Sequence, residues 1–299
     1  MNNLELPQIG LGTWLLTDYN ELKAAIHAAL EEGYRHIDTA QMYNNEADIG
    51  LILEAEKIDR NDLFLTTKIA PMNYLKHTRA SVFGSLRRLK TDYLDLVLLH
   101  AEIQSELNLQ AYKELIELQK EGKIKHIGVS NFSISGIQYL IEKTGVKPYM
   151  NQIVCSPTTR PIELETFCKE NDIQLTGYSI LKPYFTPNPF YPESALTSSE
   201  KQFLDQLCEK YDVGIGQLLN RWAIQHGYHV IPKSSRAKRV IENYHMDFTI
   251  SDTDMESIDQ MNRFSAEEYQ ENVKQWENQI TDQMLEKGLL YDTHFVRDF

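Results

Sequence analysis

The chain has 299 residues, of which 42% are hydrophobic, so it is long enough for one α/β barrel or for two smaller domains. Its formal net charge is −13, from 43 acidic and 30 basic residues, and this excess repels phosphate backbones and anionic lipid. The composition therefore argues against nucleic acid and membrane surfaces as partners. A local basic cluster near residue 236 still allows binding of a small phosphorylated ligand.

The sequence carries no signal for export or membrane insertion. The segment MNNLELPQIG lacks the basic region and the apolar run of a signal peptide, and nowhere do about 18 apolar residues follow one another. We therefore expect a cytoplasmic protein. Cys155, Cys168 and Cys208 are an odd number without CxxC spacing, so we interpret them as ordinary thiols and expect no metal site.

Short apolar strands alternate with amphipathic helical stretches, a pattern typical of βα units and a parallel sheet. Eight strands are predicted, at residues 9–14, 34–39, 63–69, 94–100, 124–130, 149–154, 173–178 and 229–233. In the stretch ELKAAIHAALEEG, apolar residues recur on one helical face and Gly33 supplies a C-terminal stop. The stretch QAYKELIELQKEG repeats this design and ends on Gly122.

Eight such units without a linker favour a single (β/α)8 TIM barrel, over residues 1–263, which would carry both catalysis and cofactor binding. The alternative is a doubly wound sheet, which requires a glycine-rich phosphate loop after the first strand. The stretch GLGTWL is a weak match, because Leu15 stands where the third glycine belongs. The loop at 181–199 carries four prolines and is long enough for a binding or lid role, or it is a surface excursion.

Residues 264–299 remain after the barrel pattern ends, and we predict a C-terminal helical extension there. Tyr269, Val273, Trp276 and Ile280 fall at helical spacing. This spacing indicates an amphipathic helix that packs on the barrel or on a partner.

Three consecutive strands end on polar side chains. Asp38 lies near the end of the second strand, with Tyr43 in the following loop, while Lys68 and His100 end the third and fourth strands. Each residue alone has an ordinary structural explanation. Active sites of (β/α)8 barrels lie at the carboxyl ends of the strands, so the convergence of all four at one mouth favours a catalytic group.

These four side chains suit the delivery of a proton. The ammonium of Lys68 favours the phenolate and should lower the pKa of Tyr43 from its ordinary value near ~10. An ion pair with Asp38 would keep Lys68 protonated, and His100 would orient a substrate oxygen. No nucleophile competes, because GVSNF matches a nucleophile elbow only as far as Ser130. An acid without a nucleophile is suited to protonate the oxygen of a carbonyl group while a separate hydride donor reduces its carbon.

At these residues the sequence resembles the aldo-keto reductase family, over about residues 4–263. The stretches GYRHIDTAQMY at 33–43 and IPKSSRAKRVIEN at 231–243 resemble two signatures of that family. The resemblance implies a (β/α)8 barrel and an NADP(H)-dependent oxidoreductase that reduces an aldehyde or a ketone to an alcohol. It also implies a catalytic tetrad, with the tyrosine as proton donor, made of Asp38, Tyr43, Lys68 and His100.

The same resemblance implies the residues that bind NADPH (NADP+), which are Thr13, Trp14, Asp38, Ser130, Asn131, Gln152, Tyr178, Ser179, Leu181, Lys233, Ser234, Arg239, Glu242 and Asn243. The roles implied within this set are the carboxamide for Ser130, Asn131 and Gln152, the nicotinamide face for Tyr178, the 2′-phosphate for Lys233, Ser234 and Arg239, and the adenine for Glu242 and Asn243. The basic cluster at 233–239 is the densest in an acidic chain, as a bound phosphate requires, so NADPH is preferred to NADH. The implied substrate contacts are Trp14, Tyr43, His100 and Ala101.

The chain departs from the family pattern where substrates are selected. Ala101 and Glu102 stand where the family usually has Trp-Pro, which removes an aromatic wall and should put a carboxylate near the pocket. The small-molecule carbonyl substrate therefore stays open. Two alternatives also stay open, namely a nicotinamide-binding regulatory or scaffold barrel that uses the tail as a partner surface, and a biosynthetic reductase with one narrow substrate. We expect a monomer or a weak dimer.

Overall fold

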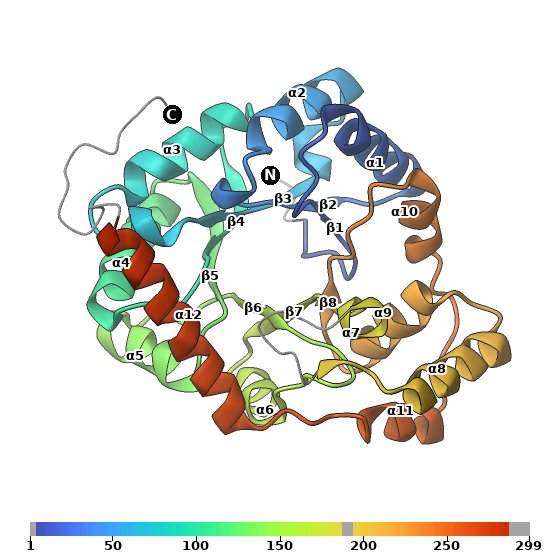
Figure 1. Ribbon diagram of the computed structural model, residues 1–299. Helices are drawn as coiled ribbons and strands as arrows, with labels where there is room; N and C mark the ends of the chain where they lie inside the picture. Colours follow the sequence, from blue (N-terminus) through green and yellow to red (C-terminus); the bar gives the residue numbers. More distant parts are fainter. Residues whose placement is uncertain (1–3, 187–193, 287–299) are drawn as a thin grey trace.

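Eight parallel strands are hydrogen-bonded in chain order in the computed structural model, which describes residues 4–186 and 194–286 (Figure 1). The strands are β1 (Leu11–Gly12), β2 (His36–Asp38), β3 (Phe64–Ile69), β4 (Leu94–Leu99), β5 (Ile124–Ser130), β6 (Met150–Val154), β7 (Gln174–Tyr178) and β8 (His229–Val230). The sheet closes on itself because Ile9 forms a parallel bridge with Val230, and the Gly10 N–H donates to the Val230 carbonyl. The predicted (β/α)8 TIM barrel is confirmed.

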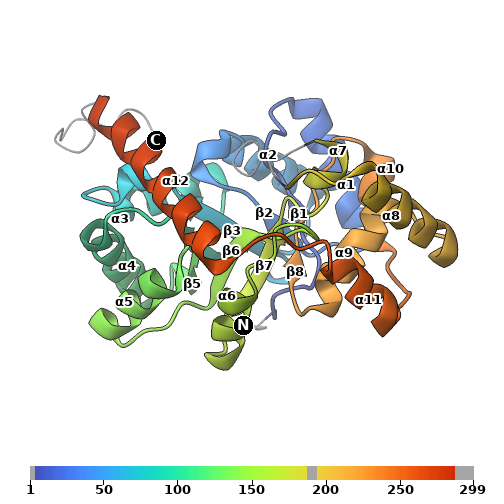
Figure 2. The same ribbon diagram turned by 60° about the horizontal axis from the view of Figure 1, so that its bottom comes forward.

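Helices follow the strands and surround the barrel (Figures 1 and 2). They are α1 (Tyr19–Glu32), α2 (Glu46–Glu56), α3 (Thr78–Arg88), α4 (Ser105–Lys120), α5 (Ile134–Thr144), α6 (Ile162–Glu170), α7 (Lys182–Phe185), α8 (Ser198–Tyr211), α9 (Ile215–Gln225), α10 (Ala237–Tyr244), α11 (Asp252–Asp259) and α12 (Ala266–Glu286). Short 3-10 helices are η1 (Gln41–Tyr43), η2 (Arg60–Asp62) and η3 (Pro71–Asn73). In the part of the chain that the structure describes, no helix is long and apolar enough to cross a bilayer.

The α1 helix forms as the sequence predicts. It begins after Asp18, whose side chain accepts a hydrogen bond from the Glu21 N–H, and it ends at Gly33. Gly33 has a φ of 111°, a left-handed conformation that side chains with a Cβ rarely adopt, and its N–H donates to the carbonyls of Ala29 and Leu30. The stop that we predicted from this glycine is confirmed.

The first and last strands are shorter than predicted. Only Leu11–Gly12 of the first and His229–Val230 of the last belong to the ladder, and the second strand, predicted at 34–39, is limited to His36–Asp38. Pro232 has no N–H to donate, and Leu15 turns out of the extended conformation with a φ of 61°. Residues 13–14 and 231–233 therefore lie in loops at the barrel mouth, where they line a cavity.

The β4 strand is buried on both faces. Leu96 and Leu98 belong to a small cluster inside the barrel, whereas Val97 and Leu99 belong to the large cluster between the sheet and the helices. Because side chains alternate along a strand, His100 continues the inward row of Leu96 and Leu98. This apolar strand therefore ends on an imidazole that faces the mouth of the barrel.

The C-terminal extension contains the predicted helix. Figure 1 shows α12 running past α6 and α5 toward α4 and α3. Tyr269 and Val273 are buried, and the Tyr269 hydroxyl donates to the Phe132 carbonyl at 3.2 Å. The side chain of Trp276 lies outside the described residues, as do 187–193 of the loop after Leu181.

Asp95 interrupts the apolar run of β4 and is held by two cations. Its buried Oδ2 accepts from the Leu65 N–H at 2.9 Å and lies 2.7 Å from an Arg60 nitrogen. Its Oδ1 lies 2.9 Å from the Lys125 Nζ. A buried carboxylate is costly unless it is paired, so these contacts tie β4 to β3, β5 and η2.

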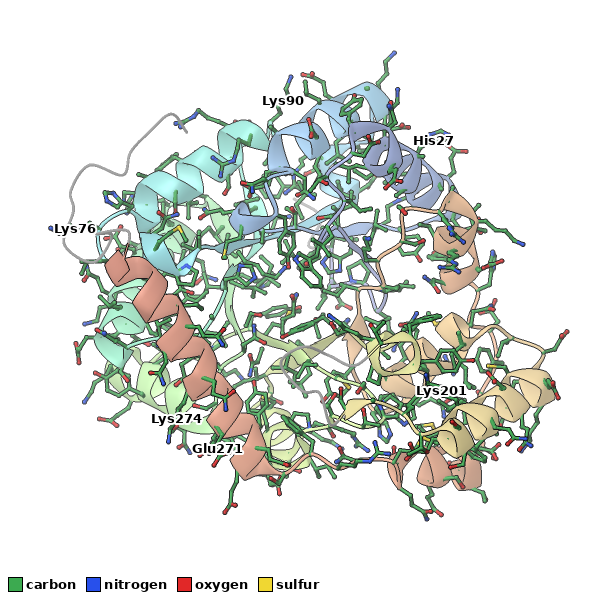
Figure 3. All side chains as sticks on the ribbon, viewed as in Figure 1. His27, Lys76, Lys90, Lys201, Glu271 and Lys274 are labelled. Atoms are coloured by element: carbon green, nitrogen blue, oxygen red, sulfur yellow. The ribbon has the colours of Figure 1, made fainter. Side chains whose placement is uncertain are left out.

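We expect Asp95→Ala to lower the free energy of unfolding by about 3 kcal/mol, because it leaves Arg60 and Lys125 without their shared partner. Urea denaturation measures this change. As a matched control, Lys90→Ala removes an exposed ion pair with Glu54 at the rim of the molecule and should cost less than about 0.5 kcal/mol (Figure 3). Equal losses in both variants would contradict the role assigned to Asp95.

Candidate active site

Four side chains from the carboxyl ends of β2, β3 and β4 meet at the barrel mouth. Asp38 ends β2, Tyr43 ends η1, Lys68 lies near the end of β3, and His100 follows β4. The Lys68 Nζ is 2.5 Å from Asp38 Oδ1, 2.9 Å from the Thr39 carbonyl oxygen and 3.4 Å from the Tyr43 hydroxyl. The ring centroids of Tyr43 and His100 are 5.7 Å apart, edge to face. The expected tetrad residues are thus neighbours.

The charge of Lys68 depends on its partners. The side chain is 1% exposed, and burial by itself would lower the pKa of an amine. The negative charge of Asp38 opposes this effect, with help from Tyr43, and the net result is a raised pKa for Lys68. A protonated amine is therefore held next to the Tyr43 hydroxyl.

Tyr43 keeps its proton at neutral pH. Burial is the largest influence and raises its pKa, Lys68 acts in the opposite direction, and the net shift is upward from the ordinary value. The expectation of a lowered pKa is wrong for this state, because it leaves out the desolvation of the phenolate. The Tyr43 hydroxyl is accordingly protonated in this state.

His100 is neutral at pH 7. Burial and the nearby charge of Lys68 lower its pKa to about 3. Its buried Nδ1 has no hydrogen-bond partner within the described residues. A neutral imidazole has one donor and one acceptor nitrogen, so it can contact an oxygen without bringing a second positive charge next to Lys68.

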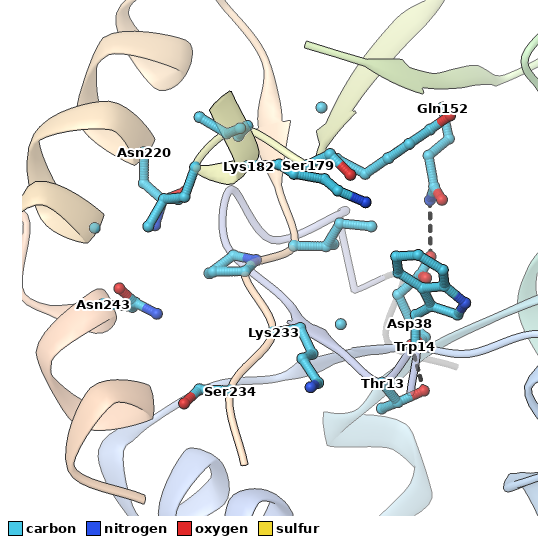
Figure 4. A pocket seen from close by; sticks show the side chains of 18 of the residues that line it. Thr13, Trp14, Asp38, Gln152, Ser179, Lys182, Asn220, Lys233, Ser234 and Asn243 are labelled. Carbon is cyan, nitrogen blue, oxygen red and sulfur yellow. Dashed lines mark hydrogen bonds between the residues drawn. The ribbon is translucent and has the colours of Figure 1, made fainter. Parts of the chain in front are cut away.

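Gln152 links the tetrad to the opposite wall. Its Nε2 donates to Asp38 Oδ2 at 2.8 Å (Figure 4), and its backbone carbonyl accepts from the Ser130 hydroxyl and the Asn131 N–H, both at 2.9 Å. The Asn131 side-chain oxygen in turn accepts from the Tyr178 hydroxyl at 2.7 Å. A continuous set of hydrogen bonds therefore fixes the ends of β2, β5, β6 and β7 relative to one another.

A cavity of about 830 Å³ occupies this end of the barrel. All but one of the predicted site residues line this cavity. They are Thr13, Trp14, Asp38, Tyr43, His100, Ala101, Ser130, Asn131, Gln152, Tyr178, Ser179, Leu181, Lys233, Ser234, Arg239, Glu242 and Asn243. The exception is Lys68, which contacts Asp38 and Tyr43 but does not line the cavity. Lys68 therefore acts on the cavity indirectly, through its contacts with two residues that line it.

One end of the cavity is basic. Lys233 and Arg239 are exposed cations from the segment that joins β8 to α10 and from α10 itself, and the buried Ser234 follows Lys233 in the chain. The α10 helix begins after Arg236 without a side-chain cap, and its Arg236 and Arg239 N–H groups bond to Ser234 and Arg236, which leaves those of Ala237 and Lys238 to an anion. Cations and helix N–H groups together suit a phosphate.

The loop after β7 reaches across the cavity. Leu181, Lys182 and Thr186 line it, and the Lys182 Nζ lies 5.5 Å from the centroid of the Trp14 ring, a cation–π distance (Figure 4). The described part of this loop is thus part of the cavity wall.

Sequence reasoning missed two walls of the cavity. One comes from α9 and the residue before it, and comprises Gly214, Ile215, Gly216, Gln217 and Asn220. In IGQLLNRWAIQ, the asparagine stands among apolar residues that are buried. A polar residue in such a stretch could have indicated a contact with the cavity. The other wall is Gln279 and Ile280 of α12, for which the sequence offered only helical spacing.

Glu102 does not line the cavity as its neighbour Ala101 does. Its carboxylate accepts from the Ser133 N–H at 2.6 Å and from the Ser133 hydroxyl at 3.1 Å, at the start of α5. A Cβ on Gly136 would lie 2.5 Å from this carboxylate, so the glycine leaves room for it. The expectation of a carboxylate near the pocket is corrected, because the N-terminus of a helix holds it.

The family model described as "Aldo/keto reductase family" matches residues 8–263. The chain is 36% identical over 264 residues to the glyoxal reductase of Bacillus subtilis (strain 168), covering 88% of this chain and 91% of that protein. It is also 36% identical over 255 residues to the methylglyoxal reductase DkgA of Escherichia coli (strain K12), covering 85% of this chain and 88% of that protein. The chain belongs to the aldo-keto reductase family and is an oxidoreductase that acts on carbonyl groups.

Solved structures agree with this assignment. An aldo-keto reductase from a Medee basin deep-sea metagenome library superposes with a TM-score of 0.78 at 35% identity, covering 87% of this chain and 93% of that one. An aldo-keto reductase of Bombyx mori, solved in complex with NADP, gives a TM-score of 0.78 at 29% identity, covering 86% and 90%. The family expected from the sequence motifs is confirmed.

We expect the His100 ring to stay neutral between about pH 5 and pH 8, since its pKa is lowered to about 3. Heteronuclear NMR of the ring, assigned with His100→Gln, should show no titration in that range. A midpoint near the ordinary ~6.5 would contradict the placement of the ring. The unfolded chain takes up a proton at His100 below ~6.5 and the folded chain does not, so this residue costs stability increasingly as the pH falls below ~6.5.

Proposed function

We propose that this protein reduces an aldehyde or a ketone to an alcohol with NADPH, and that Tyr43 supplies the proton. The observation that carries the proposal is a protonated Tyr43 held between a buried Lys68–Asp38 ion pair and a neutral His100. A cavity with a basic, phosphate-compatible end opens beside this group. Catalysis would occur at one end of the cavity and cofactor anchoring at the other.

The donor set of the cavity fits a phosphorylated dinucleotide. Ser130, Asn131 and Gln152 offer hydroxyl and amide groups of the kind that a carboxamide can pair with, and Tyr178 offers an aromatic face. At the other end, Lys233, Ser234, Arg239 and the start of α10 suit the 2′-phosphate that distinguishes NADPH from NADH. The NADP complex of the Bombyx mori relative supports this choice. When bound, NADPH supplies a hydride to the carbonyl carbon.

The side chains of this protein would hold the carbonyl oxygen and protonate it. The Tyr43 hydroxyl donates its proton to the developing oxyanion, and the neutral His100 ring orients the same oxygen. The ammonium of Lys68, 3.4 Å from the tyrosine oxygen, stabilises the phenolate left behind. Asp38 keeps that ammonium charged and in place.

Apolar side chains line the end of the cavity beside the tetrad. Trp14 is 47% exposed, Ala101 is small, and Ile280 of α12 adds an apolar side chain from the extension. The names of two relatives, glyoxal reductase and methylglyoxal reductase, support small carbonyl substrates for this chain as well. Residues 1–263 would then be the catalytic and cofactor-binding barrel, completed by an extension at 264–299.

We propose that the enzyme is cytoplasmic and a monomer or a weak dimer. Its acidic composition supports a protein that does not bind nucleic acid.

Replacing Tyr43 with Phe should lower the turnover number by about 10³-fold, because the phenyl ring has no proton to donate. NADPH oxidation is measured with glyoxal, methylglyoxal and larger aliphatic and aromatic carbonyls, and NADPH affinity is measured by fluorescence titration. The affinity should change less than about threefold. Tyr139→Phe is the matched control, since it removes a hydroxyl that donates to Glu106 between α4 and α5. Comparable turnover by wild type and Tyr43→Phe would refute the proposed acid.

Arg239→Ala should weaken NADPH binding by about 10-fold and leave NADH binding nearly unchanged, because only NADPH carries the 2′-phosphate. Lys147→Ala is the control, as it removes a cation that precedes β6 at the opposite end of the barrel and pairs with Asp172. An equal loss of affinity for both cofactors would count against a 2′-phosphate contact at Arg239.

A further inference from the structure

Asn220 is a buried amide without a partner. It lies on α9 and is 0% exposed, and neither its Oδ1 nor its Nδ2 has a hydrogen-bond partner within the described part of the chain. Two unpaired polar atoms in a buried position cost stability, and an apolar side chain of similar size would avoid that cost. The same residue lines the cavity. Its amide is therefore available to a molecule that fills the cavity.

The other asparagines that are buried within the described residues have hydrogen-bond partners. The Asn108 side chain accepts from the Ile103 N–H at 3.1 Å and donates to the Ile103 carbonyl at 2.7 Å. The Asn45 amide donates to two backbone carbonyls and its oxygen accepts from the Thr39 hydroxyl. Where asparagine has a structural role here, its amide is satisfied by the protein, and Asn220 differs in facing the cavity.

The surroundings of Asn220 place it away from the reacting end. Gly216 precedes it by one helical turn, and the Asn243 Oδ1 lies only 2.6 Å from the position that a Cβ on Gly216 would take. Leu181 lies 3.5 Å from the same position. Figure 4 shows Asn220 and Asn243 on one side of the cavity, with Asp38, Trp14 and Gln152 on the other. The glycine keeps a narrow space open between α9, α10 and the loop after β7.

We propose that Asn220 binds the adenosine half of the dinucleotide through its side-chain amide. This inference rests on the proposed function, which puts NADPH in the cavity. A primary amide presents a donor beside an acceptor, which matches the paired donor and acceptor of an adenine edge or of ribose hydroxyls. A phosphate offers only acceptors and would leave the Oδ1 of Asn220 unsatisfied. The basic residues at 233–239 are suited to bind the negatively charged phosphate instead.

Asn220→Leu separates this role from a structural one, because the two predict opposite changes in stability. Removal of an unpaired buried amide should raise the melting temperature of the cofactor-free protein by about 2 °C. The Kd for NADPH should rise about 10-fold, and the Kd for adenosine 2′,5′-bisphosphate by a similar factor. Nicotinamide mononucleotide should bind the variant as it binds wild type. The smaller variant Asn220→Ala should show the same pattern of affinities.

Asn108→Leu is the matched control, because it removes a buried asparagine whose amide is satisfied by the backbone. It should lower the melting temperature and leave both dissociation constants unchanged. For Asn220→Leu, unchanged affinity for NADPH at any melting temperature overturns the inference. Weaker binding of nicotinamide mononucleotide with unchanged binding of the bisphosphate overturns the assignment to the adenosine half. If the wild-type protein does not bind NADPH, the proposed function itself fails, which is a distinct result.

Discussion

The ion pair between Lys68 and Asp38 is the constraint on which the site depends. Both side chains are almost fully removed from water, where a single charge would be prohibitively costly. Each therefore requires the other, and the Thr39 carbonyl and the Gln152 amide satisfy further atoms of the pair. The ends of β2, β3 and β6 at the barrel mouth must therefore lie where these hydrogen bonds can form. The same ion pair determines the electrostatic environment of the Tyr43 hydroxyl.

The barrel topology makes such an arrangement possible with residues far apart in the chain. Parallel strands in sequential order bring all their carboxyl ends to one rim, so Asp38 meets Gln152 across 114 positions of sequence. The helices and the apolar clusters provide the rigidity that keeps these ends in register. Polar residues then need only lie at or near the carboxyl half of a strand, where they do not disturb the apolar core beneath.

The sequence predicted the parts of the site that follow from regular geometry. The number of strands follows from the βα pattern, and the meeting of Asp38, Tyr43, Lys68 and His100 at one mouth follows from the place of strand ends in a barrel. The direction of the Tyr43 pKa did not follow, because it depends on the balance between burial and a neighbouring charge, which only coordinates provide. The orientation of Glu102 toward α5, and the approach of α12 to the cavity, depend on packing between elements that no local pattern encodes.

The exclusion of Lys68 from the cavity wall has a chemical consequence. Primary amines condense with aldehydes to form imines, but only through their uncharged form and only when the carbonyl carbon can reach the nitrogen. Lys68 is both protonated and screened by its contacts with Asp38 and Tyr43, so it fails both conditions. The arrangement thus lends the site a positive charge without exposing a nucleophile. A protein that acts on carbonyl groups is in this way spared covalent modification at its own central lysine.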